Sequence, residues 1–152
     1  MYLIVCENYD EMSKRAAELI AAQINENPES VLGLATGSTA EGVYKYLSDM
    51  NRDGKADFKK VTTFNLDEYY PLSCENEQSY HYFMNKHLFS HVNIDMKKTH
   101  IPDGVAADPQ KECREYEEKI AEAGGIDLQL LGIGRNGHIG FNEPDNNLYT
   151  YT

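Results

Sequence analysis

The chain has few cysteines, little positive charge and no long hydrophobic run, and each shortage excludes a class of protein. Its three cysteines are odd in number, widely separated and without C-x-x-C spacing, so we expect neither a disulfide framework nor a structural zinc site. Fourteen basic residues against twenty-five acidic ones give a net charge of -11, which repels nucleic acid and anionic lipid. The apolar run at residues 3–6 is far shorter than a signal peptide's core or a membrane span. We therefore expect a cytoplasmic protein that binds neither nucleic acid nor a membrane.

The order of apolar runs and helical patterns predicts an α/β fold. Short apolar or β-branched runs, typical of strands, stand at residues 2–5, 31–34, 61–66 and 126–133. Helical patterns follow or separate them, at residues 8–24, 39–50, 79–89 and 108–123. Strands without strict polar alternation predict a mostly parallel sheet with helices on both faces, whose ligands bind at the strands' carboxyl ends. Because there is no repeat or linker, we expect residues 1–152 to form a single domain.

The first candidate loop, at residues 36–39, reads Thr-Gly-Ser-Thr and follows the second predicted strand. Backbone N–H groups, two hydroxyls and a helix N-terminus can hold a phosphate without much help from cations. The loop lacks the lysine of a Walker A motif. An ordinary glycine turn with a Ser or Thr cap would explain it equally well.

The second candidate loop places two adjacent carboxylates, Asp67 and Glu68, just past a predicted buried strand. That location favours a general base that moves a substrate proton. A solvated acidic turn or a helix cap is at least as common an explanation. The aromatic stripe that follows, with Tyr80 and Phe83, is typical of helix packing.

The third candidate loop spans residues 132–144 and has four glycines within nine residues. These glycines allow positive φ and close approach to a ligand, while His138 and Glu143 form a titratable pair. The G-x-G-x-x-G spacing also fits a dinucleotide fingerprint, but a proline and the end of the chain interrupt the long helix that such a site needs. A core histidine bonded to backbone is a further alternative for His138.

Two other histidines, His87 and His91, lie four residues apart on a predicted helix. They would share a face, but the glutamate of the zinc-protease pattern is absent. We expect surface histidines and no metal site.

Taken together, the three loops resemble the glucosamine-6-phosphate deaminase family in order and approximate spacing. The most specific stretches are Phe-Asn-Leu-Asp-Glu-Tyr and Gly-His-Ile-Gly-Phe-Asn-Glu-Pro, whereas the related 6-phosphogluconolactonases differ after the histidine. The resemblance covers residues 2–144. It implies a Rossmann-like α/β fold and the conversion of glucosamine 6-phosphate and water into fructose 6-phosphate and ammonia, without a metal or redox cofactor.

The resemblance also implies roles for residues of the first two loops. Asp67 would be the base that takes the proton from C2 of the opened sugar and returns it at C1. Gly37, Ser38 and Thr39 would cradle the phosphate.

In the third loop, the resemblance implies that His138 acts as acid and base in opening the sugar ring. Asn136 and Glu143 would orient the imidazole. Because an asparagine cannot stabilise an imidazolium by charge, we expect Glu143 to carry that task alone.

Members of the family continue well beyond the third loop, so the resemblance implies that this chain is truncated, corresponding to their N-terminal part. The remaining part of those proteins supplies further strands, a lid and basic residues that neutralise the phosphate. Without it, the last predicted strand is a bare sheet edge that invites association with another copy. A sugar-phosphate-binding or sensing module without turnover is therefore the alternative to an enzyme.

Overall fold

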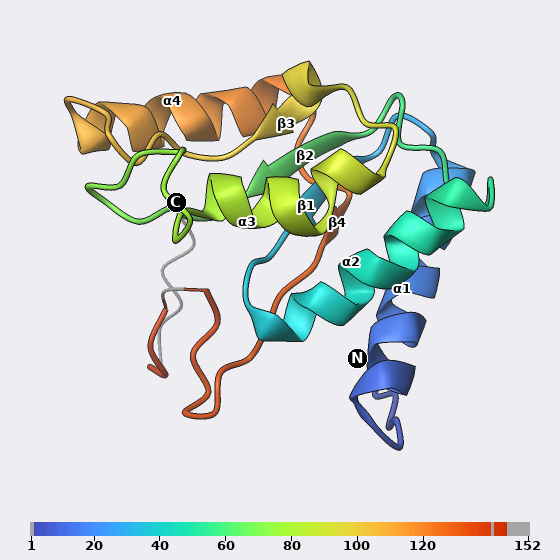
Figure 1. Ribbon diagram of the computed structural model, residues 1–152. Helices are drawn as coiled ribbons and strands as arrows, with labels where there is room; N and C mark the ends of the chain where they lie inside the picture. The colour runs from blue at the N-terminus through green and yellow to red at the C-terminus, as the bar shows by residue number, and fades with distance from the viewer. Residues whose placement is uncertain (1, 141, 146–152) are drawn as a thin grey trace.

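The computed structural model, which describes residues 2–140 and 142–145, has an α/β architecture (Figure 1). Its elements in chain order are α1 (Tyr9–Glu26), β1 (Val31–Leu34), α2 (Ser38–Arg52), β2 (Thr62–Asn65), α3 (Tyr80–His87), the short 3-10 helices η1 (Phe89–His91) and η2 (Met96–Lys98), β3 (Thr99–His100), α4 (Pro109–Glu122) and β4 (Leu128–Gln129). The four strands form one parallel sheet in the order β3-β2-β1-β4. The predicted fold class is confirmed.

Helices cover both faces of this sheet. The larger core cluster joins α1, α2 and α3 to one face, through residues such as Ala17, Val43 and Met84. A smaller cluster on the other face packs Tyr116 of α4 against Val31 and Phe64. In Figure 1, α4 accordingly lies on one side of the sheet, and α1 and α2 lie on the other. Among the described residues, no helix is both long enough and apolar enough to cross a bilayer.

Local sequence signals mark the ends of the helices as expected. Asn8 Oδ1 caps α1 by accepting a hydrogen bond from the Glu11 N–H at 2.9 Å. Asp108 caps α4 and is followed by proline in the first turn. Gly124 and Gly125, with φ of 93° and 87°, follow that helix in a conformation that other residues rarely adopt. The helix α2 runs to Arg52, two residues beyond the expected end.

The strand pairing orders the sheet around β1. All four residues of β1 are buried and pair with β2, from Val31 opposite Thr62 to Leu34 opposite Asn65. The strand β4 is shorter than the predicted 126–133, since it pairs with β1 only at Leu128 and Gln129. Among the described residues β4 has one neighbouring strand, β1, and lies at an edge of the four-stranded sheet.

One strand predicted from the sequence is wrong, and one strand of the structure was not predicted. Residues 2–5 form no strand, and Tyr2 is completely exposed. A strand needs a neighbour for its backbone bonds, and no described residue pairs with this segment. The sequence reading also missed β3, because Thr99 and His100 are only two residues long and form no apolar run.

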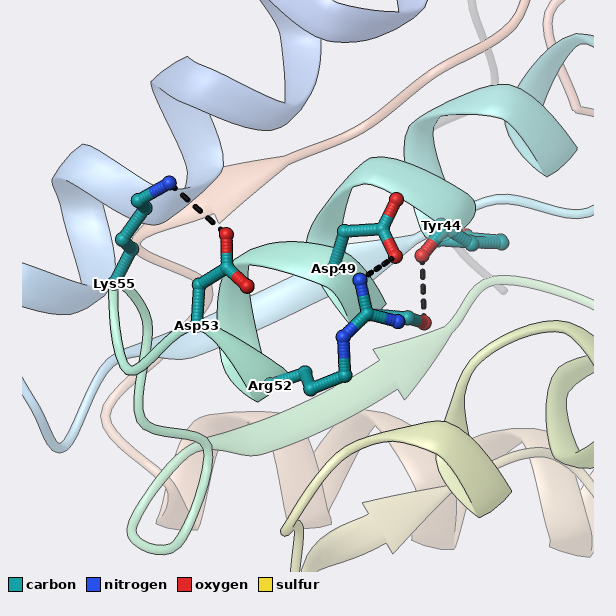
Figure 2. A network of polar contacts seen from close by, with 6 residues as sticks. Tyr44, Asp49, Arg52, Asp53 and Lys55 are labelled. Carbon is teal, nitrogen blue, oxygen red and sulfur yellow. Dashed lines mark hydrogen bonds and ion pairs between the residues drawn. The ribbon is translucent and has the colours of Figure 1, made fainter.

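One polar contact of α2 reaches the segment before the helix, whereas the ion pairs near its C-terminal end are local (Figure 2). The Tyr44 hydroxyl donates to the Ala35 carbonyl, directly before the first candidate loop, and burial raises the pKa of Tyr44 well above its usual range. At the other end, Arg52 pairs with Asp49 at 2.7 Å and Lys55 pairs with Asp53 at 3.0 Å. These ion pairs are exposed and add little stability, whereas Tyr44 fixes the start of the loop.

Candidate active site

All three candidate loops border one cavity at the carboxyl ends of β1, β2 and β4. Its volume is about 710 Å³. The residues of the sequence prediction that line it are Gly37, Ser38, Thr39, Asp67, His138 and Glu143; Asn136 does not line it but contacts His138. The sheet topology thus brings together side chains that are far apart in the sequence.

The first loop leaves the N-terminus of α2 open toward the cavity. Gly37 has a φ of 101°, and α2 begins at the next residue without a side-chain cap. Ser38 and Thr39 are exposed. Because the first N–H groups of a helix have no partner within it, this end can donate hydrogen bonds to an anion. The alternative of a Ser or Thr cap is wrong here, since Gly37 occupies the cap position.

A tyrosine of α1 holds this loop in place. The Tyr9 hydroxyl donates to the Ser38 carbonyl at 2.7 Å and accepts from the Gly42 N–H at 2.8 Å. A Cβ at Gly42 would lie 2.4 Å from Ser13 Oγ and 2.9 Å from the Tyr9 hydroxyl oxygen, so a larger residue would force the helices apart. The sequence reading missed Tyr9, because a tyrosine in a first helical turn resembles ordinary surface.

The two adjacent carboxylates of the second loop have different environments. Glu68 turns away from the cavity and accepts from the N–H groups of Tyr69 and Tyr80 at 2.9 Å and of His81 at 3.1 Å. Asp67 lines the cavity. Burial, and then the charge of Glu68, raise the pKa of Asp67 to about 6. The helix-cap explanation therefore holds for Glu68, and a proton-transfer role remains open for Asp67.

Tyr80 begins α3, next to the capping residue Ser79, and lines the cavity. Burial, followed by a hydrogen bond with Tyr69, raises the pKa of Tyr80 well above its usual range, while a hydrogen bond with Thr36 acts in the opposite direction. The ring centres of Tyr80 and Tyr69 are 4.9 Å apart. Tyr80 thus links the first loop to the second, whereas the sequence predicted that it packs within the helical core. The packing prediction holds for Phe83, whose ring meets the Tyr44 ring edge-on.

The third loop is a tight turn and not the start of a helix. Gly134 N–H donates to the His138 carbonyl at 2.8 Å, and Gly137, with a φ of 90°, donates to the Gly134 carbonyl at 2.9 Å. A Cβ at Gly134 would lie 2.2 Å from His138 Cε1, so any side chain at position 134 would collide with the imidazole where it now lies. No described residue after position 131 is helical, which contradicts the dinucleotide interpretation.

A chain of polar contacts fixes the imidazole. Asn136 Nδ2 donates to Glu143 Oε2 at 2.9 Å, and Asn136 Oδ1 lies 2.6 Å from His138 Nδ1. Because a carboxylate only accepts, the Asn136 amide turns its oxygen to the ring, and His138 Nδ1 must carry a proton. In the neutral ring, Nε2 is then free to accept a proton. Glu143 meets Asn136 in this chain, so it acts on the imidazole through the amide, and His138 is not a core histidine bonded to backbone.

The two other histidines of the sequence prediction, His87 and His91, do not line the cavity. His91 is exposed and its Nε2 lies 2.9 Å from the Lys86 carbonyl oxygen. His87 is half-buried against Phe83, with ring centres 4.4 Å apart, rather than on the surface as predicted. Across the described residues, no three His, Cys, Asp or Glu side chains lie together in a way that suits a metal ion.

Comparison with known proteins identifies close relatives. A family described as glucosamine-6-phosphate isomerases/6-phosphogluconolactonase matches residues 7–141. The chain is 60% identical to the glucosamine-6-phosphate deaminase of Halothermothrix orenii over all 152 residues, which are 63% of that protein. It is 59% identical over 145 residues to the enzyme of Clostridioides difficile, covering 95% of this chain and 58% of that one.

Solved structures agree with these relatives. A monomeric glucosamine-6-phosphate deaminase superposes with a TM-score of 0.92 at 47% identity, over 95% of this chain and 60% of the other. A 6-phosphogluconolactonase from Thermotoga maritima gives a TM-score of 0.76 at 27% identity, over 92% and 62%. The chain spans about three fifths of the length of the curated relatives that it matches.

Proposed function

The chain belongs to the family of glucosamine-6-phosphate isomerases and 6-phosphogluconolactonases, and we propose that it binds glucosamine 6-phosphate and catalyses its deamination to fructose 6-phosphate and ammonia. The observation that carries this proposal is the single cavity that joins an open helix N-terminus, a carboxyl group with a raised pKa and an oriented imidazole. In the proposed reaction the helix N-terminus would bind the phosphate, the carboxyl group would act as the base, and the imidazole would open the sugar ring.

The phosphate would bind at Gly37, Ser38 and Thr39. The open N-terminus of α2 supports this assignment, because its N–H groups and helix dipole favour an anion. Among the described residues that line the cavity none is Lys or Arg, so backbone and hydroxyl donors would carry the attraction.

Asp67 would move the proton between C2 and C1 of the opened sugar. A pKa of about 6 supports this role, since the carboxyl is then mostly ionised at pH 7 but readily protonated. One group can thus remove the proton from C2 and return it to C1, which converts an aldose into a ketose. The amino group then leaves as ammonia while water adds its oxygen to C2, so the ketose and ammonia balance the starting sugar and water.

His138 would open the pyranose ring. The protonated Nδ1 toward Asn136 fixes which nitrogen is available, so Nε2 would exchange the proton between the anomeric hydroxyl and the ring oxygen. Glu143 would orient this pair through the amide of Asn136. This arrangement supports a ring-opening role that needs no metal ion.

The decisive experiment measures ammonia release from glucosamine 6-phosphate by the 152-residue chain and by its Asp67→Asn variant. The matched control is Asp53→Asn, which makes the same change at an exposed acid near the far end of α2. We expect release from the wild-type chain and the control, and none from Asp67→Asn. Absence of ammonia release by the folded wild-type chain would refute the proposal.

A second candidate is a sugar-phosphate-binding module without turnover. The absence of Lys and Arg among the described residues that line the cavity favours it. It predicts stabilisation of the chain by glucosamine 6-phosphate in a thermal shift assay, equally in wild type and Asp67→Asn, with no ammonia. NAD should have no effect under either proposal.

A further inference from the structure

Glu68 is adjacent to Asp67 but does not line the cavity. Its two carboxylate oxygens instead receive three backbone hydrogen bonds, one from its own loop and two from the first turn of α3. The two bonds from α3 cross 12 and 13 residues of sequence, so Glu68 closes the segment between β2 and α3 into a loop. The family resemblance implied no role for the Glu68 side chain.

We propose that Glu68 is a positioning residue, which fixes the Asp67 carboxyl group against the cavity by clamping the loop after β2 onto the N-terminus of α3. The proposal rests on the role of Asp67 proposed above. Glu68 itself touches neither the cavity nor a reacting atom.

The clamp works because the loop is also held from its other side. Leu72 N–H donates to the Gly104 carbonyl at 2.9 Å. A Cβ at Gly104 would lie 2.3 Å from the Leu72 carbonyl oxygen and 2.6 Å from that of Tyr69. Residues 67–72 therefore pack between Gly104 on one side and α3 on the other. Because both sides are held, the Asp67 side chain has little freedom to leave the cavity.

The position of Glu68 at the N-terminus of α3 is also electrostatically favourable. Its charge lies at the positive end of the α3 dipole, which compensates a negative group at low cost. Ser79 serves the next donor, Tyr82 N–H, at 3.0 Å. Glutamate and serine together satisfy the first three N–H groups of α3, which neither could do alone.

The same charge acts on Asp67. Burial is the larger cause of the raised Asp67 pKa, and Glu68 is the other. The remaining titratable groups around Asp67, from α3, α4 and the loops that line the cavity, are Tyr69, Glu77, Tyr80, Tyr116, His138 and Glu143. Removing the charge of Glu68 while retaining its shape should therefore lower the Asp67 pKa but leave it above the usual value of about 4.

The test compares wild type, Glu68→Gln and Glu68→Asp by NMR, with Glu75→Gln as the control. Glu75 is an exposed acid of the same loop. In Glu68→Gln, we expect the carboxyl titration of Asp67 to move from about 6 to lower pH, and in the control to stay unchanged. In Glu68→Asp, which is one methylene too short to reach α3, we expect the Tyr80 and His81 amides to exchange about tenfold faster.

An unchanged Asp67 titration in Glu68→Gln, or unchanged amide exchange in Glu68→Asp, would overturn the proposal. Should either variant fail to fold, the wild-type chain decides: the Tyr80 and His81 amides, which donate to Glu68, must be protected from hydrogen exchange, and unprotected amides refute the clamp. None of these measurements requires turnover. If the expected shifts appear but the chain releases no ammonia, Glu68 positions Asp67 and the proposed function fails separately.

Discussion

Replacing Asp67 by asparagine should stabilise the folded chain at neutral and alkaline pH. The half-buried carboxyl group has a pKa raised from 3.8 to about 6, first by burial and then by Glu68. Ionising it in the fold is therefore less favourable than ionising it in the unfolded chain. An asparagine of similar shape carries no charge and avoids this cost.

The magnitude follows from the shift of roughly 2 pH units. At 1.36 kcal/mol per unit, the upper limit is about 3 kcal/mol. Because Asp67 is partly open to the cavity and hence to solvent, screening reduces this figure, and we expect a gain of about 1–2 kcal/mol in the free energy of unfolding above pH 7.

The sign and the pH window follow from linkage. Well below the unfolded-state pKa of 3.8, the Asp67 carboxyl is protonated in both states, and it does not lower the free energy of unfolding of the wild-type chain. As the pH rises through about 6, the folded chain holds its proton more tightly than the unfolded chain does, so wild-type stability falls relative to Asp67→Asn. The difference should open between pH 4 and 6 and stay constant above pH 7.

Urea unfolding at pH 4, 5, 6, 7 and 8 measures this difference. Asp53→Asn is an informative control, because a hydrogen bond and the charge of Lys55 lower the pKa of Asp53. Its carboxylate contributes stability above the unfolded pKa that is lost on acidification, so this variant should show the opposite pH dependence. If wild type and Asp67→Asn keep a constant difference from pH 4 to pH 8, the carboxyl of Asp67 is not perturbed as argued.

Three further variants test the loops of the cavity. Gly134→Ala should displace the His138 ring, change its NMR signals and lower ammonia release at least tenfold, whereas Gly132→Ala, which meets nothing within 4 Å, should be near neutral. Tyr9→Phe should lose about 1 kcal/mol of stability, measured by urea unfolding, and weaken binding of glucosamine 6-phosphate, because the first loop loses its brace. Asn136→Asp should change the pH profile of release, since a charge would replace the amide beside the imidazole; an unchanged profile would contradict the role of this amide.

The parts of the fold that depend on local signals were predictable from the sequence. Caps such as Asn8 and Asp108, and the buried run that became β1, act through neighbouring residues and are visible in any window of the chain. The strand expected at residues 2–5 failed for the opposite reason. An apolar run becomes a strand only when another strand bonds to it, and no sequence pattern reports whether that partner is present.

The candidate site likewise has features that local sequence signals predict and features that they do not. Glycine spacing and strand ends predicted which loops meet, because parallel strands place their carboxyl ends on one edge. The sequence could not predict which of Asp67 and Glu68 lines the cavity, since the two acids are adjacent and chemically similar. Their difference arises from α3, which begins twelve residues later and offers its N–H groups to only one of them.

The cavity also shows features that stability alone would not favour. Ionising the half-buried carboxyl group of Asp67 costs free energy in the folded chain. A glycine at position 134 increases the backbone entropy of the unfolded chain. The uncapped start of α2 leaves its first backbone N–H groups without a side-chain acceptor. Under the proposed function one ligand would satisfy them together, because its phosphate would accept from the helix donors and its C2 proton would be taken by the Asp67 carboxylate.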